Sequence, residues 1–206
     1  MAGTAWWSVI PIASEWMRWN LLLAWIPLVL SVLLFRVVPQ RSPFWWLGVA
    51  VFVAFLPNAP YILTDVIHLV EEMQHTDSRL VGSLIIFPKY LLFLLLGFGA
   101  YVLSLVNLGL YVQAAGRRSW ELPLEWTLHG LSAIGIYLGR FDRLNSWDLV
   151  TQPGQVLVRL GQILTTGRSL LIILALTVGL AGLYWLGKQV VLGLRALSHL
   201  RRQSPV

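Results

Sequence analysis

Residues 55–69 read FLPNAPYILTDVIHL and place polar and ionisable side chains inside a segment that is otherwise apolar enough to lie in a membrane. On a helix, steps of three or four residues return to the same face, so Asn58, Tyr61, Asp65 and His68 share one side. A charge at bilayer depth costs about 2.5–3.5 kcal/mol on insertion scales, so such residues usually face protein or water. The stretch therefore predicts a buried polar face in a helical membrane protein.

The composition of the whole chain agrees with a membrane location. Hydrophobic residues make up 57% of the 206 residues and charged residues only 12%, and the mean hydropathy is +0.73. Soluble domains are about 45–50% apolar, so we expect an all-α integral membrane protein that forms a single domain over residues 1–206. The chain has no cysteine, which excludes disulfides, thiolate metal sites and cysteine nucleophiles.

The apolar runs predict a bundle of about five transmembrane helices, since each span needs about 20 apolar residues. The expected spans are residues 20–35, 44–70, 88–111, 122–141 and 169–187. The second span is expected to be broken at Pro57 and Pro60, because each proline removes an amide donor from the helix. Interfacial amphipathic helices are expected around residues 155–165 and in a basic tail at residues 188–206.

The net charge of +6 comes from basic residues scattered at the ends of apolar runs, which favours a role in membrane orientation and argues against nucleic-acid binding. With five spans, the cytoplasmic side would carry Arg36, Arg41, Arg117, Arg118, Lys188, Arg195, Arg201 and Arg202. We therefore expect the N-terminus outside and the C-terminus in the cytoplasm. The bias is modest, because Arg143, Arg159 and Arg168 fall on the other side.

The fourth expected span carries a second polar stripe. On a helix at 3.6 residues per turn, one side collects Glu125, His129, Ser132, Arg140 and Arg143. Gly135 and Gly139 flank the stripe as a GxxxG pair, a spacing that lets another helix approach closely. We therefore expect the broken second span to pack against this helix.

Two contacts are predicted from this packing. The second and fourth spans run in the same direction in the expected topology, so Asp65 and Arg140 reach similar depth and are expected to form an ion pair. His129 lies deeper, near the break at Pro57, where its ring can donate to the carbonyl groups that the prolines leave free.

Two carboxylate and imidazole pairs suggest a metal site. Asp65-x-x-His68 and Glu125-x-x-x-His129 each place both groups on one helical face, as a metal site in a bundle requires. A hydrogen-bonded or interfacial histidine is the more common explanation of each spacing, so the metal site is the alternative reading. The chain has no HExxH motif, no Gly-x-Ser-x-Gly motif and no phosphate-binding glycine loop, so whether it is an enzyme stays open.

Two motifs, PNAPYILTDVIHL at residues 57–69 and LSAIGIYLGRFDRLNSWDLVTQP at residues 131–153, resemble a bacterial family of polytopic membrane proteins, domain of unknown function 1361. The resemblance implies that the characteristic positions in this chain are Asn58, Pro60, Tyr61, Thr64, Asp65, His68, Gly135, Tyr137, Gly139, Arg140, Asn145, Trp147 and Asp148. It also implies a multi-pass protein of the bacterial plasma (inner) membrane, but no mechanism. Relatives often carry an acidic residue where the third span begins, whereas this chain has Pro88, Lys89 and Tyr90.

Three functions are compatible with a polar pocket that opens toward the outer face. The first is binding of an anionic membrane lipid or small ligand, or stabilisation of a protein partner, by Asn58, Tyr61, Asp65, His68, Arg140, Arg143, Asn145 and Asp148. The second is a metal-assisted hydrolase or transferase acting on a lipid, with zinc on Asp65, His68 and His129 and with Asp148 as base. The third is a proton-linked transporter that uses Glu125, His129 and Asp65, the first two of which form a polar ladder with Ser132 on the fourth span. The ligand and the oligomeric state are not decided by the sequence.

Overall fold

The protein is all-α, as the composition and the apolar runs predict. The computed structural model describes residues 14–38, 42–76 and 78–203, and these residues form helices and no strand. Of the residues used to predict the orientation, Arg41 lies outside the described residues, and so does the end of the basic tail at residues 204–206.

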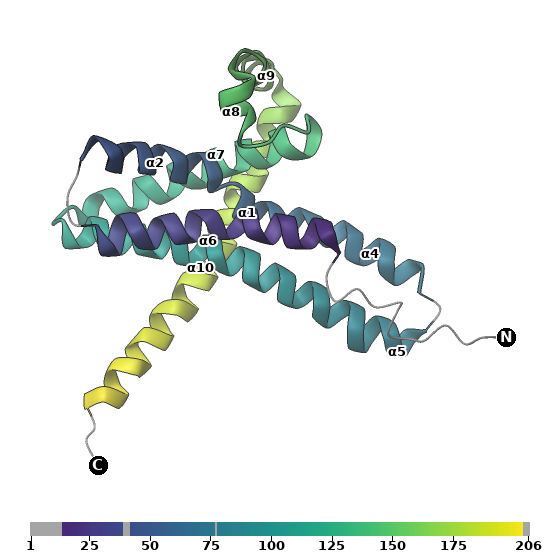
Figure 1. Cartoon of the computed structure of the whole chain (residues 1–206), viewed down its shortest axis with the longest axis horizontal. Coiled ribbons are helices and arrows are strands. Elements are labelled where there is room, and N and C mark those ends of the chain that lie inside the picture. The colour runs from purple at the N-terminus through teal and green to yellow at the C-terminus, as the bar shows by residue number, and fades with distance from the viewer. Residues whose placement is uncertain (1–13, 39–41, 77, 204–206) are drawn as a thin grey trace.

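Four long helices lie side by side and form the body of the molecule (Figure 1). They are α1 (Glu15–Val32), α2 (Pro43–Phe55), α6 (Phe87–Ala114) and α7 (Glu121–Phe141). The last helix, α10 (Gly167–Gln203), runs across this group in Figure 1 and packs mainly on α7 and also on α6. The molecule is therefore a bundle whose final helix crosses the others.

The predicted break in the second span is confirmed. After α2, two residues in a turn lead into the short helix α3 (Asn58–Tyr61), the 3₁₀ turn η3 (Ile62–Asp65) and α4 (Val66–Gln74). Pro57 and Pro60 cannot donate backbone hydrogen bonds, which explains why the α-helix stops and restarts here. Asn58, Tyr61 and Asp65 of this broken stretch border a space that residues of α1 and α7 also line, and Asp65 is buried.

Four helical segments among the described residues are long and apolar enough to cross a membrane: Glu15–Val37, Pro43–Gln74, Arg79–Ala114 and Gly167–Ser198. The first includes α1 and the π-helical turn η2 (Leu33–Val37), and the third includes α5 (Arg79–Val81), the π-helical turn η4 (Gly82–Ile86) and α6. They correspond to the first, second, third and fifth predicted spans. The protein is thus an integral membrane protein.

The fourth predicted span corresponds to α7, which has 21 residues but is more polar than the other four segments. Its polarity comes from side chains such as Glu125, His129 and Arg140. Whether α7 crosses the membrane stays a prediction, and with it the expected orientation of the two termini.

Of the two predicted amphipathic helices, the first is present as a separate helix and the second is not. Residues 155–165 fall in α9 (Pro153–Thr165), which buries Val156 and Ile163 and exposes Leu157 and Leu164. The basic tail, by contrast, is not a separate surface helix, because it continues α10 without interruption to Gln203. At about 1.5 Å per residue, the 37 residues of α10 extend well beyond a hydrocarbon layer of about 30 Å.

Candidate functional site

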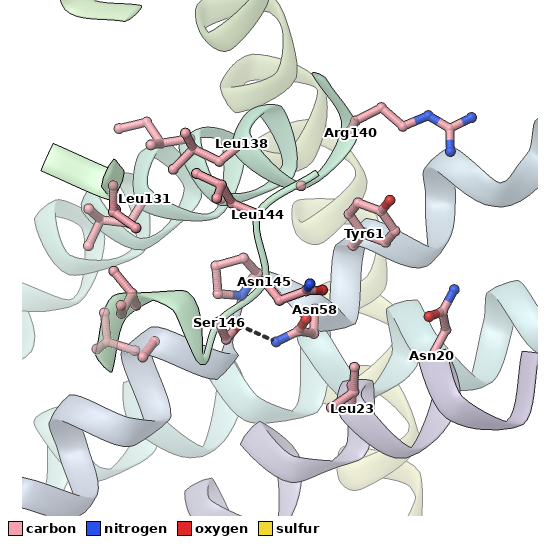
Figure 2. Close-up of a pocket in the computed structure, with 18 of the residues that line it drawn as sticks. Asn20, Leu23, Asn58, Tyr61, Leu131, Leu138, Arg140, Leu144, Asn145 and Ser146 are labelled. Atoms are coloured by element: carbon pink, nitrogen blue, oxygen red, sulfur yellow. Dashed lines mark hydrogen bonds between the residues drawn. The ribbon is translucent and has the colours of Figure 1, made fainter. Parts of the chain in front are cut away.

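A cavity of about 610 Å³ opens between the first turns of α1, the broken second span, the second half of α7 and the segment that contains α8 (Asp148–Thr151) and α9. Figure 2 shows apolar side chains such as Leu131 and Leu138 toward one side and Arg140, Tyr61 and Asn20 toward the other. The polar lining residues are Asn20, Asn58, Tyr61, Asp65, His68, Arg140, Asn145 and Ser146. The cavity therefore has an apolar part and a polar end.

Most of the residues predicted to bind a ligand lie on the wall of this cavity. The structure brings together Asn58, Tyr61, Asp65, His68, Arg140 and Asn145, which come from two distant parts of the chain. Sequence reasoning missed Asn20 and Ser146. The signal for Asn20 was a single amide at the start of an otherwise apolar run, and Ser146 stood inside the NSWD segment.

The GxxxG pair holds the broken span against α7, as predicted. A Cβ atom added to Gly135 would lie 2.5 Å from Cβ of Pro57, and one added to Gly139 would lie 3.0 Å from the ring of Tyr61. Real Cβ atoms do not tolerate the first distance, so the small residues are what allows Pro57 and Tyr61 to lie on α7. This packing fixes the wall of the cavity.

Asp65 is 2% exposed, and its Oδ2 accepts a hydrogen bond of 2.9 Å from Nδ2 of Asn20. The predicted ion pair between Asp65 and Arg140 is wrong, because Arg140 forms no hydrogen bond or ion pair with any described residue. The two groups line the same cavity and are close enough for their charges to interact. The prediction compared only two helices and did not foresee that Asn20 from α1 would bind the carboxylate.

Asn58 fastens the broken span to the loop after α7. Its Nδ2 donates to the carbonyl oxygen of Phe55 at 2.9 Å and to Oγ of Ser146 at 2.8 Å, the second of which is drawn in Figure 2. The first bond satisfies a carbonyl near the proline break, where the helix ladder is interrupted. The second places Asn145 and Ser146 at the edge of the cavity.

Two residues predicted to bind a ligand do not line the cavity. Arg143 is exposed, and its φ of 56° places it in the left-handed region just after the end of α7. Asp148 is buried and accepts a bond of 2.6 Å from the backbone N–H of Asn145 through Oδ2. The carboxylate of Asp148 therefore closes the loop and is not presented to the cavity as a ligand or as a base.

The zinc set of Asp65, His68 and His129 is not assembled. Nδ1 of His68 lies 3.1 Å from Glu71, and its ring lies 4.9 Å from that of Trp16. His129 points to another part of the molecule, and the described residues contain no group of three or more His, Cys, Asp or Glu side chains placed to hold a metal ion. The metal-site hypothesis therefore has no support in the geometry.

The polar ladder faces away from the cavity, toward α6 and α10. Oε1 of Glu125 accepts bonds of 2.6 Å from Lys188 and 2.6 Å from the hydroxyl of Tyr184, both on α10. Nδ1 of His129 lies 2.7 Å from the hydroxyl of Tyr101 on α6, so the predicted bonds from His129 to carbonyls near Pro57 are wrong.

Ser132 is completely buried next to the hydroxyl of Tyr101. The ladder and Asp65 thus belong to separate clusters, which removes the geometric basis for a proton path that joins them. Lys188 also binds Glu121 at 2.7 Å. The ion pairs of Lys188 with Glu121 and Glu125 therefore connect α7 and α10, and we call this cluster the fastener between the two helices.

Comparison with known proteins adds the family but no activity. A family model described as "Protein of unknown function (DUF1361)" matches residues 19–181, which is most of the chain, so the protein belongs to this family. Comparisons with curated proteins and with solved structures found no match.

Proposed function

We propose that this member of the DUF1361 family binds an amphiphile whose head group carries an anionic phosphate or carboxylate, such as a membrane phospholipid, in the cavity. The observation that carries the proposal is Arg140, a guanidinium on the cavity wall that has no hydrogen-bond or ion-pair partner among the described residues. A guanidinium offers five donors in a planar fork that matches phosphate and carboxylate groups. An anion that enters the cavity would supply the missing partner.

The apolar part of the cavity supports an amphiphile over a small polar ligand. Leucine and valine side chains of α7, α8 and α9 line it, including Leu131, Leu138, Leu149, Val156 and Leu160. Ligand sites of this kind are mostly apolar and use a few polar groups to fix orientation. An acyl chain would contact the apolar wall while its head group reached the polar end.

The position of the polar end fits the level of a lipid head group. Asn20 lies five residues after Glu15, where α1 begins, and Arg140 is the last residue but one of α7. At about 1.5 Å per residue, both lie within roughly 8 Å of a helix end. In the expected orientation, with the N-terminus outside, this end of the cavity opens toward the outer face of a bacterial plasma membrane.

A matched pair of arginine variants tests the proposal. Arg140 and Arg143 are three residues apart, and replacing either with Gln removes one positive charge, but only Arg140 lines the cavity. Short-chain phosphatidylglycerol is titrated into detergent-purified protein, and bound lipid is measured by native mass spectrometry. A lost hydrogen bond to a charged group costs about 1.5–3 kcal/mol, so Arg140→Gln should weaken binding about 10- to 100-fold.

The control variant Arg143→Gln should bind within about twofold of wild type. Equal loss in both variants would indicate general attraction to a basic surface, and no loss in either would refute binding at Arg140. The apolar wall is tested separately with Leu138→Asn, which should weaken lipid binding without changing the charge of the protein.

A further inference from the structure

Asp65 is a second charged group on the cavity wall. Binding of an anion to Arg140 does not give this carboxylate a ligand group to bind. Its side chain is 2% exposed, yet it borders the cavity. Its hydrogen-bond partner among the described residues is the neutral amide of Asn20, and no described cation lies within 4.0 Å of it. A buried carboxylate is costly unless a cation or several donors satisfy it.

The two opposite charges face the same space without pairing. Among the described residues, the basic side chains close enough to act on the charge of Asp65 are Arg140 and His68, and both line the cavity. Nδ1 of His68 lies 3.1 Å from Oε2 of Glu71. Asp65 is held in place by Asn20, and the GxxxG contact of α7 with Pro57 and Tyr61 sets the distance between the two walls. The cavity thus presents an acceptor and a donor at one end.

From this arrangement we propose that the head group is zwitterionic, with an ammonium that donates to Asp65 and a phosphate that accepts from Arg140. The ligand would then be a phospholipid with a primary amine, such as phosphatidylethanolamine. This inference rests on the proposed function, because it requires the phosphate of the same lipid to bind Arg140. An ammonium carries three donors and no acceptor, which suits a carboxylate that has one oxygen committed to Asn20. A glycerol head would satisfy Arg140 through its phosphate but offer Asp65 only neutral hydroxyl donors, and a free phosphate would offer it no cation.

Wild-type protein provides the first test without any substitution. Binding of phosphatidylethanolamine, phosphatidylglycerol and phosphatidylcholine with identical acyl chains is compared by native mass spectrometry. We expect phosphatidylethanolamine to bind about tenfold more tightly than phosphatidylglycerol, because a charge-assisted hydrogen bond is worth about 1.5–3 kcal/mol. Equal affinity for these two lipids would overturn the inference. Tighter binding of phosphatidylcholine would also overturn it, because a quaternary ammonium has no N–H to donate.

The second test uses Asp65→Asn, which keeps the shape of the side chain and its ability to accept from Asn20. The tenfold preference should fall to within about twofold in this variant, whereas Arg140→Gln should weaken binding of both phospholipids and keep the preference. If Asp65→Asn keeps the full preference, the inference fails while anion binding at Arg140 still stands. If no phospholipid binds to wild type, the proposed function itself fails.

A third arm separates a lipid from its soluble head group. Glycerophosphoethanolamine, which has the same charges but no acyl chains, is added as a competitor. The inference requires that it compete only at concentrations at least 100-fold higher than the lipid, because it makes no contact with the apolar wall. Competition at equal concentration would show that the cavity selects a soluble zwitterion, which would contradict assignment to a lipid. Thermal melting of Asp65→Asn shows whether it is folded, and if it is not, the wild-type comparison decides.

Discussion

Gly135 of α7 lies directly against Pro57, so closely that a Cβ atom on the glycine would come within 2.5 Å of Cβ of the proline. This contact joins the two features that organise the molecule, the broken second span and the GxxxG pair of α7. Because Pro57 begins the break, its contact with α7 also sets where Asn58, Tyr61 and Asp65 stand in the cavity.

The first prediction concerns this contact. Gly135→Ala should lower the free energy of unfolding by about 1–3 kcal/mol, because the added methyl group overpacks the interface. Gly130→Ala is the matched control on the same helix, since nothing lies within 4 Å of its added Cβ, and it should be neutral or stabilising by up to about 1 kcal/mol. Thermal unfolding in detergent measures both. Equal melting temperatures for the two variants would show that the close approach is not needed.

The second prediction concerns the fastener between α7 and α10. Lys188→Met should destabilise the protein by up to about 3 kcal/mol, because it leaves the partly buried carboxylate of Glu121 and the buried carboxylate of Glu125 without the ammonium that binds both. Adding Glu125→Gln to Lys188→Met should recover part of the loss, since one of the two unpaired charges is removed. A double-mutant cycle by thermal or denaturant unfolding measures the coupling. Additive losses would contradict a direct interaction between Lys188 and Glu125.

The third prediction concerns the link between the broken span and the loop after α7. Asn58→Ala removes the bonds to Phe55 and Ser146 and should cost about 1–2 kcal/mol, because it also leaves a helix carbonyl without its donor. Ser146→Ala removes only the second bond and should cost about half as much. Limited proteolysis of residues 142–152, combined with melting curves, measures the loosening of the loop. If Ser146→Ala has the larger effect, the account of Asn58 is wrong.

The fourth prediction concerns the backbone at Arg143. Its φ of 56° favours glycine, because other side chains pay about 1–2 kcal/mol in this region. Arg143→Gly should therefore keep or raise the melting temperature, and Arg143→Val should lower it, since a β-branched residue is least tolerated there. Neither variant should change lipid affinity by more than about twofold, since Arg143 does not line the cavity. A drop in affinity with unchanged stability would give Arg143 a role in the site.

Local patterns in the sequence were enough to predict the fold class, the broken span and its packing on the GxxxG pair. Each depends on residues near one another in the chain, such as Pro57 and Pro60, or Gly135 and Gly139. The grouping of the cavity residues around Asp65 also followed from helical spacing. Each of these features depends on the spacing of residues within one helix, so the periodicity of the sequence is enough to predict it.

The sequence could not show which neighbour each face of α7 meets. The stripe from Glu125 to Arg140 looked continuous, but its first part packs on α6 and α10 while Arg140 borders the cavity. This division depends on where α10 crosses the bundle, which is a tertiary property. Asn20 was missed for the same reason, because a single amide in an apolar run shows no spacing that would link it to Asp65.

The lipid that the protein retains tests binding at Arg140 most directly. Wild type, Arg140→Gln and Arg143→Gln are extracted in a mild detergent, and the phospholipid bound per protein is measured by mass spectrometry. We predict that wild type and Arg143→Gln retain about one phospholipid and that Arg140→Gln loses most of it. Retention of the same lipid at the same level in Arg140→Gln would contradict the assignment of Arg140 as the anchor of the cavity.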